Sequence, residues 1–260
     1  MQEKVDRSFL AKEAHKIHEC AQENLNQISG RCATKETIQD YYLGILRRQA
    51  ILTLDLKTIL EKSPVDNLTT PLIICRCLVD DFLHIFYLHE ENNEGENIVR
   101  INAEAYSENF KSLEGLTKSN HQHFEGRYAL YMTGKELQEI KDYFASQSDN
   151  KKYFSNLAKF EFKRFITNAQ LAEGIKDFEL SKMSLRALFL WKQFSAFTHF
   201  TNLTFGYEMT PSNRDAYLFE IEETLLYSYN TVKWAFKFFE KRDGIKFFDN
   251  GLDDRYKIEK

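Results

Sequence analysis

The sequence contains little glycine and proline, with 10 Gly and 3 Pro among 260 residues. So few turn-forming residues argue against a sandwich or barrel built from many short strands. Hydrophobic residues make up 43% and charged residues 28% of the chain, which supplies material for a core and excludes a disordered polypeptide. The composition therefore predicts an all-α fold.

The chain also lacks an excess of positive charge, since its formal net charge is −4. No overall positive field attracts nucleic acid or an anionic membrane, which leaves a local basic patch as the electrostatic route to such partners. Long apolar runs are missing too, because even the most apolar segment, 185–207, contains Arg186 and Lys192. The sequence thus predicts a cytoplasmic protein without a membrane partner.

Metal-binding and catalytic signatures are scarce. Four cysteines occur, at Cys20, Cys32, Cys75 and Cys77. Cys75 and Cys77 are two residues apart, but no second Cys or His pair at zinc-ligand spacing accompanies them. The four are therefore predicted to be buried thiols in a reducing compartment. The sequence contains no phosphate-binding glycine loop, HExxH pair, nucleophile elbow or CxxC motif. We therefore expect no cofactor.

Apolar residues recur at intervals of three and four along most of the chain, which is the pattern of amphipathic helices. This pattern, together with capping and proline signals, predicts helices over 5–28, 35–60, 70–90, 99–113, 133–144, 153–165, 168–178, 181–207 and 211–242. A surface loop is expected after 113, and the last two helices should form an antiparallel hairpin.

No linker or internal repeat divides the sequence. The prediction is a single helical bundle over 1–242 with a decorated middle segment and a C-terminal hairpin of long helices. Residues 243–260 are expected to form a loosely attached tail. A two-lobed arrangement, divided near 92–120, is the alternative.

Charged residues interrupt the apolar helix PLIICRCLVDDFLHIFYLHE. Arg76, Asp80 and His84 are spaced by four and so share one face. A charge buried in such a helix must be paired or hydrogen-bonded, because an isolated one costs several kcal/mol. One interpretation is a structural ion pair between Arg76 and Asp80, beside an ordinary half-buried histidine. The other is a functional site.

A similar polar set lies in LRALFLWKQFSAFTHFTNLTF, where Lys192, Ser195 and His199 are spaced by three and four. If this helix packs against the one that carries Arg76, the two sets converge in one polar pocket. Asp80 would then orient a histidine that acts as a base or a ligand. A metal-dependent enzyme that uses Asp80, His84 and His199 is a further alternative.

Three weaker candidates are better explained without a ligand. His15 and His18 have metal-ligand spacing on a charged helix, where a solvated surface is the simpler interpretation. His121 and His123 belong to the predicted loop and would reach a phosphate, but a plain exposed loop is favoured. The aromatic run that begins at Trp234 is expected to form core packing rather than a base-stacking platform.

The segments RCLVDDFLHIFYL and WKQFSAFTH resemble a bacterial family of helical domains of unknown function. In that family, an arginine and an acidic residue on one helix accompany a serine and a histidine on another, the positions of Arg76, Asp80, Ser195 and His199. The family is similar in architecture to the HEPN group, many of whose members are ribonucleases of toxin and defence systems. Their catalytic arginine lies close to the histidine in sequence, whereas this chain has Lys192 and Gln193 there.

The resemblance implies a nucleotide- or RNA-interacting domain of the HEPN-like kind. His199 would act as a general base on a ribose hydroxyl, and Arg76 would supply the missing positive charge from the neighbouring helix. The alternative from the residues themselves is a non-catalytic helical module that binds another protein or forms a homodimer through aromatic surface. Contact between the two polar helices is the assumption on which the site depends.

Overall fold

The computed structural model describes residues 5–29, 37–64, 68–90, 93–125, 132–198 and 211–258. Helices account for most of these residues, which confirms the predicted all-α class. The chain divides into two compact units. The first combines Met1–Asn92 with Thr167–Lys260, and the second is Asn93–Ile166. The middle segment, predicted as a decoration of one domain over 1–242, is thus a compact unit inserted into the other.

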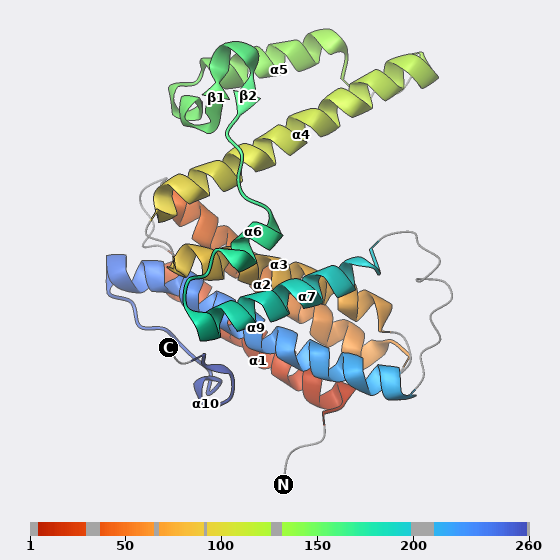
Figure 1. The fold of residues 1–260 in the computed structure, drawn as a ribbon, viewed down its shortest axis with the longest axis vertical. Helices are drawn as coiled ribbons and strands as arrows, with labels where there is room; N and C mark the ends of the chain where they lie inside the picture. The colour runs from red at the N-terminus through yellow and green to blue at the C-terminus, as the bar shows by residue number, and fades with distance from the viewer. Residues whose placement is uncertain are drawn as a thin grey trace. The chain divides into compact units, whose positions relative to one another are not determined.

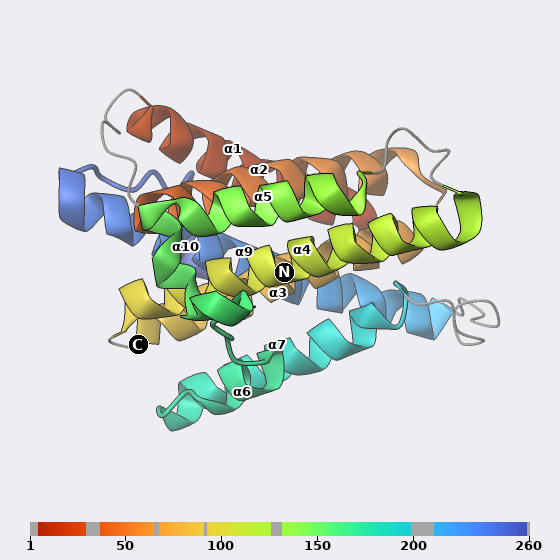
Figure 2. The same ribbon diagram turned by 90° about the horizontal axis from the view of Figure 1, so that it is seen from above.

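The first unit is a bundle of long helices that run side by side (Figure 1). From above, α7 lies on the opposite side of α9 from α1 and α2 (Figure 2). The helices of this unit are α1 (Arg7–Ile28), α2 (Thr37–Lys62), α3 (Thr69–Glu90), α6 (Asn168–Glu173), α7 (Phe178–Ser195), α9 (Pro211–Asp243) and α10 (Asp253–Tyr256). Among the described residues, no helix combines the length and apolar character needed to cross a bilayer.

Helix α3 is the centre of this bundle, because α2, α6, α7 and α9 all contact it. Its sequence is apolar on nearly every side, as a helix surrounded by others must be. Phe82 stacks on Tyr227 of α9 with ring centroids 4.4 Å apart, and Phe86 stacks on Trp234 at 5.0 Å. The aromatic run that begins at Trp234 is therefore core packing, as the sequence indicated.

The second unit contains α4 (Glu94–Phe124), α5 (Gly134–Ser146), a 3-10 turn (Ser148–Tyr153) and a two-stranded antiparallel sheet, β1 (Phe154–Asn156) and β2 (Glu161–Phe162). Its core is aromatic. The Phe154 and Phe162 rings stack across the strand pair at 4.6 Å, and Phe110 of α4 lies against Phe144 of α5 at 5.4 Å.

Two predictions about this unit are wrong. The loop expected after residue 113 is helical, because α4 continues through Gly115 to Phe124, and His121 and His123 belong to its exposed last turn. The helix expected over 153–165 is the hairpin of β1 and β2. Its aromatic residues pair across two strands, and Phe160 takes a left-handed conformation at the turn, with φ 54°.

The capping signal predicted at the start of α5 is confirmed. Thr133 Oγ1 accepts the backbone N–H of Glu136, whose carboxylate accepts the backbone N–H of Thr133, so both halves of the capping box at α5 are made. Thr167 and Gln170 form the same reciprocal pair at the start of α6. This second box fixes the first residue of α6, Asn168, next to α3.

The C-terminal segment is not the loosely attached tail that the sequence predicted. Leu252 and Tyr256 are buried, and two buried asparagines hold the segment by its backbone. Asn24 of α1 donates to the carbonyl of Phe248 at 2.8 Å and accepts its N–H at 3.0 Å. Asn230 of α9 donates to the carbonyl of Tyr256 at 2.6 Å. These bonds join the segment to α1 and α9.

Candidate functional site

The two helices that carry the predicted polar residues are in contact. Helix α7 packs along α3, and Arg76 of α3 donates its Nε–H to Ser195 Oγ of α7 at 2.9 Å. Ser195 in turn donates to the backbone carbonyl of Trp191 at 2.7 Å. Ser195 therefore links Arg76 to the last turn of α7 through two hydrogen bonds. The helix contact that the site depends on is thus present at Arg76 and Ser195.

The Arg76 side chain is half-buried and lies over an aromatic ring. Its guanidinium carbon is 5.1 Å from the centroid of the Trp191 ring, an arrangement that favours a cation. Within the described part of the chain, neither terminal nitrogen of Arg76 has a hydrogen-bond or ion-pair partner. The Nε1–H of Trp191 is buried and has no acceptor there either. Donors that remain unpaired at a half-buried position are available to an acceptor from outside.

Asp80 does not pair with Arg76, contrary to the ion pair that the sequence suggested. Its carboxylate accepts the side-chain N–H of Asn168 at 2.7 Å, and Arg76 turns to Ser195. Residues four apart share a helix face, but α6 and α7 each place a competing polar partner against that face. The positive charge of Arg76 is therefore not neutralised by a carboxylate within the described residues.

The remaining predicted residues occupy different environments. His84 donates from Nδ1 to the backbone carbonyl of Asp80 at 2.8 Å, so it contacts the backbone of Asp80 and not its carboxylate. Lys192 is exposed on α7. His199 lies outside the described residues, and its place relative to Arg76 stays a prediction. The metal hypothesis needs His199 too, and the described residues contain no cluster of three side chains that could hold a metal ion.

A second polar cluster, which the sequence analysis missed, lies between α2, α3 and α9. Asp81 is 3% exposed and accepts from Gln49 Nε2 at 2.8 Å, while Gln49 Oε1 accepts from Ser228 at 2.6 Å. Arg48 lies 3.3 Å from the other oxygen of Asp81. Burial raises the pKa of Asp81 to about 7, against the effects of Arg48 and Gln49, which lower it. This carboxyl is poised to exchange a proton near neutral pH.

The sequence carried a partial signal for these additional residues. Gln49 and Thr53 are two polar residues one turn apart on the buried side of α2, which indicates a polar contact inside the core. The Thr167–Gln170 box marked the start of α6 and hence the position of Asn168. Neither signal names the partner, because partner choice depends on how the helices pack.

The described cysteines and His18 are not parts of the Arg76 site. Cys20 and Cys75 are buried free thiols, and burial raises the pKa of Cys20 to about 12, so it is a poor nucleophile. Cys77 is half-buried, and Cys32 lies outside the described residues. His18 donates from Nδ1 to the carbonyl of Ala50 at 2.8 Å, and is therefore a half-buried residue between α1 and α2 rather than a solvated one.

The fold and the site together define a helical-bundle protein with an arginine held between two helices and no internal counter-ion among the described residues. No protein-family model, curated protein or solved structure matches this chain. Function must therefore be argued from the residues of the site itself.

Proposed function

We propose that the chain is a nucleotide- or RNA-interacting helical domain of the HEPN-like kind, in which Arg76 binds a phosphate group. The observation that carries this proposal is the state of Arg76. Its Nε is fixed by Ser195 and its plane lies over Trp191, while its terminal nitrogens lack partners among the described residues. An arginine oriented in this way presents a fork of donors that suits the oxygens of a phosphate.

In the proposed reaction, His199 takes the proton of a ribose 2′ hydroxyl, and the resulting oxygen attacks the adjacent phosphorus. The bond from phosphorus to the 5′ oxygen breaks, and that oxygen takes up a proton. Arg76 stabilises the negative charge that builds on the phosphoryl oxygens. His199 follows Ser195, the partner of Arg76, by four residues in the sequence.

The biological setting belongs to the same proposal. A bacterial origin and a role in a defence or toxin system are what the resemblance at the Arg76, Asp80, Ser195 and His199 positions implies, and a cytoplasmic location is the expectation from the lack of long apolar runs. Binding is the part of the proposal that the described residues support, and cleavage depends in addition on His199.

The binding claim can be tested with a fluorescently labelled single-stranded RNA and the purified full chain. Arg76→Gln should weaken binding by about tenfold or more, since hydrogen bonds to a charged group contribute about 1.5–3 kcal/mol. It should also reduce the slope of log affinity against log salt by about 1, as expected for the loss of one phosphate contact. Lys182→Gln, which removes one exposed charge from α7, is the matched control.

The cleavage claim needs a separate measurement. His199→Ala should bind the RNA as the parent does and lose any cleavage of it, whereas Arg76→Gln should lose both. If the parent chain neither binds nor cleaves single-stranded RNA and also fails to bind mononucleotides, the proposal is wrong. Binding that Arg76→Gln leaves unchanged would remove Arg76 from the site.

A second candidate function is a dimerisation module, and a specific surface favours it. Helix α7 exposes a stripe of large apolar side chains: Phe178 at 70%, Leu185 at 46% and Phe189 at 54%. Their spacing of seven and four residues places them along one side of the helix, as in the contact seam of paired helices. A second copy of α7 is the proposed partner, because the stripe is then matched by an identical apolar one.

Sedimentation analysis of the parent and of the double variant Leu185→Glu with Phe189→Glu tests this candidate. The parent should sediment as a dimer and the variant as a monomer with the same helical content, since both side chains are exposed. A parent that stays monomeric at high concentration excludes the module. RNA binding by a monomeric variant would show that the two candidate functions are independent.

A further inference from the structure

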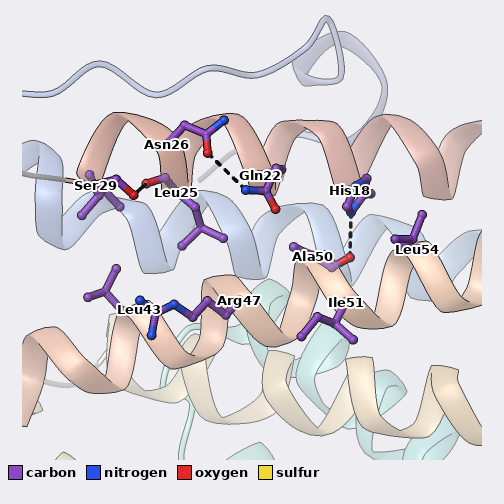
Figure 3. Close-up of a pocket in the computed structure, with 11 residues that line it drawn as sticks. His18, Gln22, Leu25, Asn26, Ser29, Leu43, Arg47, Ala50, Ile51 and Leu54 are labelled. Atoms are coloured by element: carbon purple, nitrogen blue, oxygen red, sulfur yellow. Dashed lines mark hydrogen bonds between the residues drawn. The ribbon is translucent and has the colours of Figure 1, made fainter.

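A groove of about 590 Å³ runs between α1 and α2 (Figure 3), and neither Arg76, Trp191 nor Ser195 lines it. Its volume lies within the range of roughly 300–1,000 Å³ that is usual for small-molecule sites. Both helices contribute polar and apolar side chains to it. The residues that carry the argument are His18, Gln22 and Leu25 of α1 and Arg47, Ile51 and Leu54 of α2.

The apolar part of the groove is unusually open for aliphatic side chains. Ile51 is 61% exposed and Leu54 is 39% exposed, and both lie at the end of the groove where His18 contacts Ala50 (Figure 3). A ligand with an apolar body would remove this surface from water, which is favourable through the hydrophobic effect. The groove therefore suits a short hydrocarbon chain or ring.

The polar part of the groove carries one permanent charge, that of Arg47. Its side chain extends along α2 toward Leu43 (Figure 3), and no residue in the described ranges forms a hydrogen bond or ion pair with it. The described residues that line the groove include no acidic one. Glu19 and Glu23 of α1 line an adjoining cavity, where Glu19 accepts from Asn250 at 3.3 Å. An anionic group is the complement of this end.

Hydrogen bonds fix the walls of the groove before any ligand arrives. His18 donates to the carbonyl of Ala50, which ties α1 to α2 at one end. Gln22 donates to Asn26 Oδ1 at 3.2 Å along the α1 wall (Figure 3). A preformed site loses less entropy on binding than one that must be ordered.

We propose that this groove binds a small amphipathic anion, with its anionic group paired to Arg47 and its apolar body lying along Ile51 and Leu54. The separation of the charged part from the aliphatic part along one groove is what selects this class of molecule. The site is distinct from the phosphate site at Arg76, and neither proposal depends on the other.

Calorimetric titration of the full chain with octanoate, and with octylammonium as its counterpart of opposite charge, tests the proposal. Octanoate should saturate a single site, and octylammonium should bind at least about tenfold more weakly because Arg47 repels it. Arg47→Gln should weaken octanoate binding about tenfold. Ile51→Glu should weaken it as well, by placing a carboxylate beside the apolar floor.

Lys12→Gln, which removes an exposed charge from α1 outside the groove, is the matched control and should bind octanoate as the parent does. Circular dichroism checks that each variant folds; Arg47 and Ile51 are exposed, so helical content should not change. The proposal is overturned if octanoate shows no saturable binding, if the two amphiphiles bind equally well, or if Arg47→Gln binds octanoate as tightly as the parent.

Discussion

Asp81 is a carboxyl group buried inside the bundle, where its charged form is disfavoured. Desolvation raises its pKa to about 7, while Arg48 and Gln49 oppose that rise and Asp80 adds to it. The nearby Tyr41 hydroxyl has a raised pKa as well, first because it is itself buried and then because Asp81 and Asp80 are close to it. Because the folded pKa exceeds the unfolded value near 3.9, the folded state binds more protons than the unfolded state between these two values.

It follows that the free energy of unfolding should fall as the pH rises from about 4 to about 7, and then level off. The pKa difference limits this loss to about 4 kcal/mol. Asp81→Asn keeps an oxygen for Gln49 and has no charge to bury, so it should remove most of the slope. Urea unfolding at a series of pH values measures it, with exposed Asp55→Asn as the control. Parallel pH profiles for the parent and Asp81→Asn would contradict this account.

The spacing of Arg76, Asp80 and His84 predicted correctly that these residues share one helix face, and it failed to predict their partners. Arg76 and Asp80 appeared able to satisfy each other, yet each is taken by a residue far away in sequence, Ser195 and Asn168. Local periodicity gives the direction of a side chain on its own helix. Which neighbouring helix supplies a partner depends on packing that no local pattern contains.

At the scale of the element, one glycine within a helix and one just after a helix differ in how closely their surroundings are packed. Gly44 is in the interior of α2, where an added Cβ would meet no atom within 4 Å. Gly174 follows α6, where a Cβ would lie 3.0 Å from both the carbonyl oxygen of Gln170 and Cε2 of Tyr87. The same substitution should therefore have opposite effects at the two positions.

Gly44→Ala should stabilise the protein by about 0.5–1 kcal/mol, because alanine loses less backbone entropy in a helix. Gly174→Ala should destabilise it by roughly 1 kcal/mol or more, because Tyr87 must move. Both positions belong to the same unit, so a single unfolding transition compares them. A destabilising Gly44→Ala would mean that another surface covers this part of α2.

Element prediction succeeded where local signals agree and failed where tertiary contacts override them. The capping box at Thr133 and Pro211 at the start of α9 mark true helix starts. Gly115 and the polar residues after it were interpreted as a loop, although α4 continues through them. Phe154 and Phe162 fit a helical period as well as a strand pair, and their cross-strand stacking decides between the two.

At the scale of the whole molecule, a buried asparagine joins the first helix, α1, to the C-terminal segment. The side chain of Asn24 is fully buried and pairs with both the N–H and the carbonyl of Phe248. Composition suggested a loose tail after residue 242, because it records Gly, Asp and Lys there and not the asparagines on α1 and α9 that hold the backbone.

Asn24→Ala should leave the N–H of Phe248 without its partner and its carbonyl with the Cys20 thiol alone, which donates to it at 3.1 Å, and should cost about 1–3 kcal/mol. Hydrogen exchange at the Phe248 amide should accelerate, while exchange in α3 changes far less. Asn26→Ala, an exposed position on the same helix, is the control and should change neither. Unchanged exchange at Phe248 in Asn24→Ala would show that Asn24 does not hold the C-terminal segment.

The central claim is that Arg76, fixed by Ser195 and Trp191, offers to a phosphate the terminal donors that have no partner among the described residues. NMR observation of the Arg76 Nε–Hε group during titration with adenosine monophosphate tests it most directly. The account predicts a protected resonance in the free protein, because Ser195 accepts this proton, and a saturable shift on titration that Ser195→Ala weakens. A resonance that does not respond at saturating nucleotide, while other residues do, would contradict the claim.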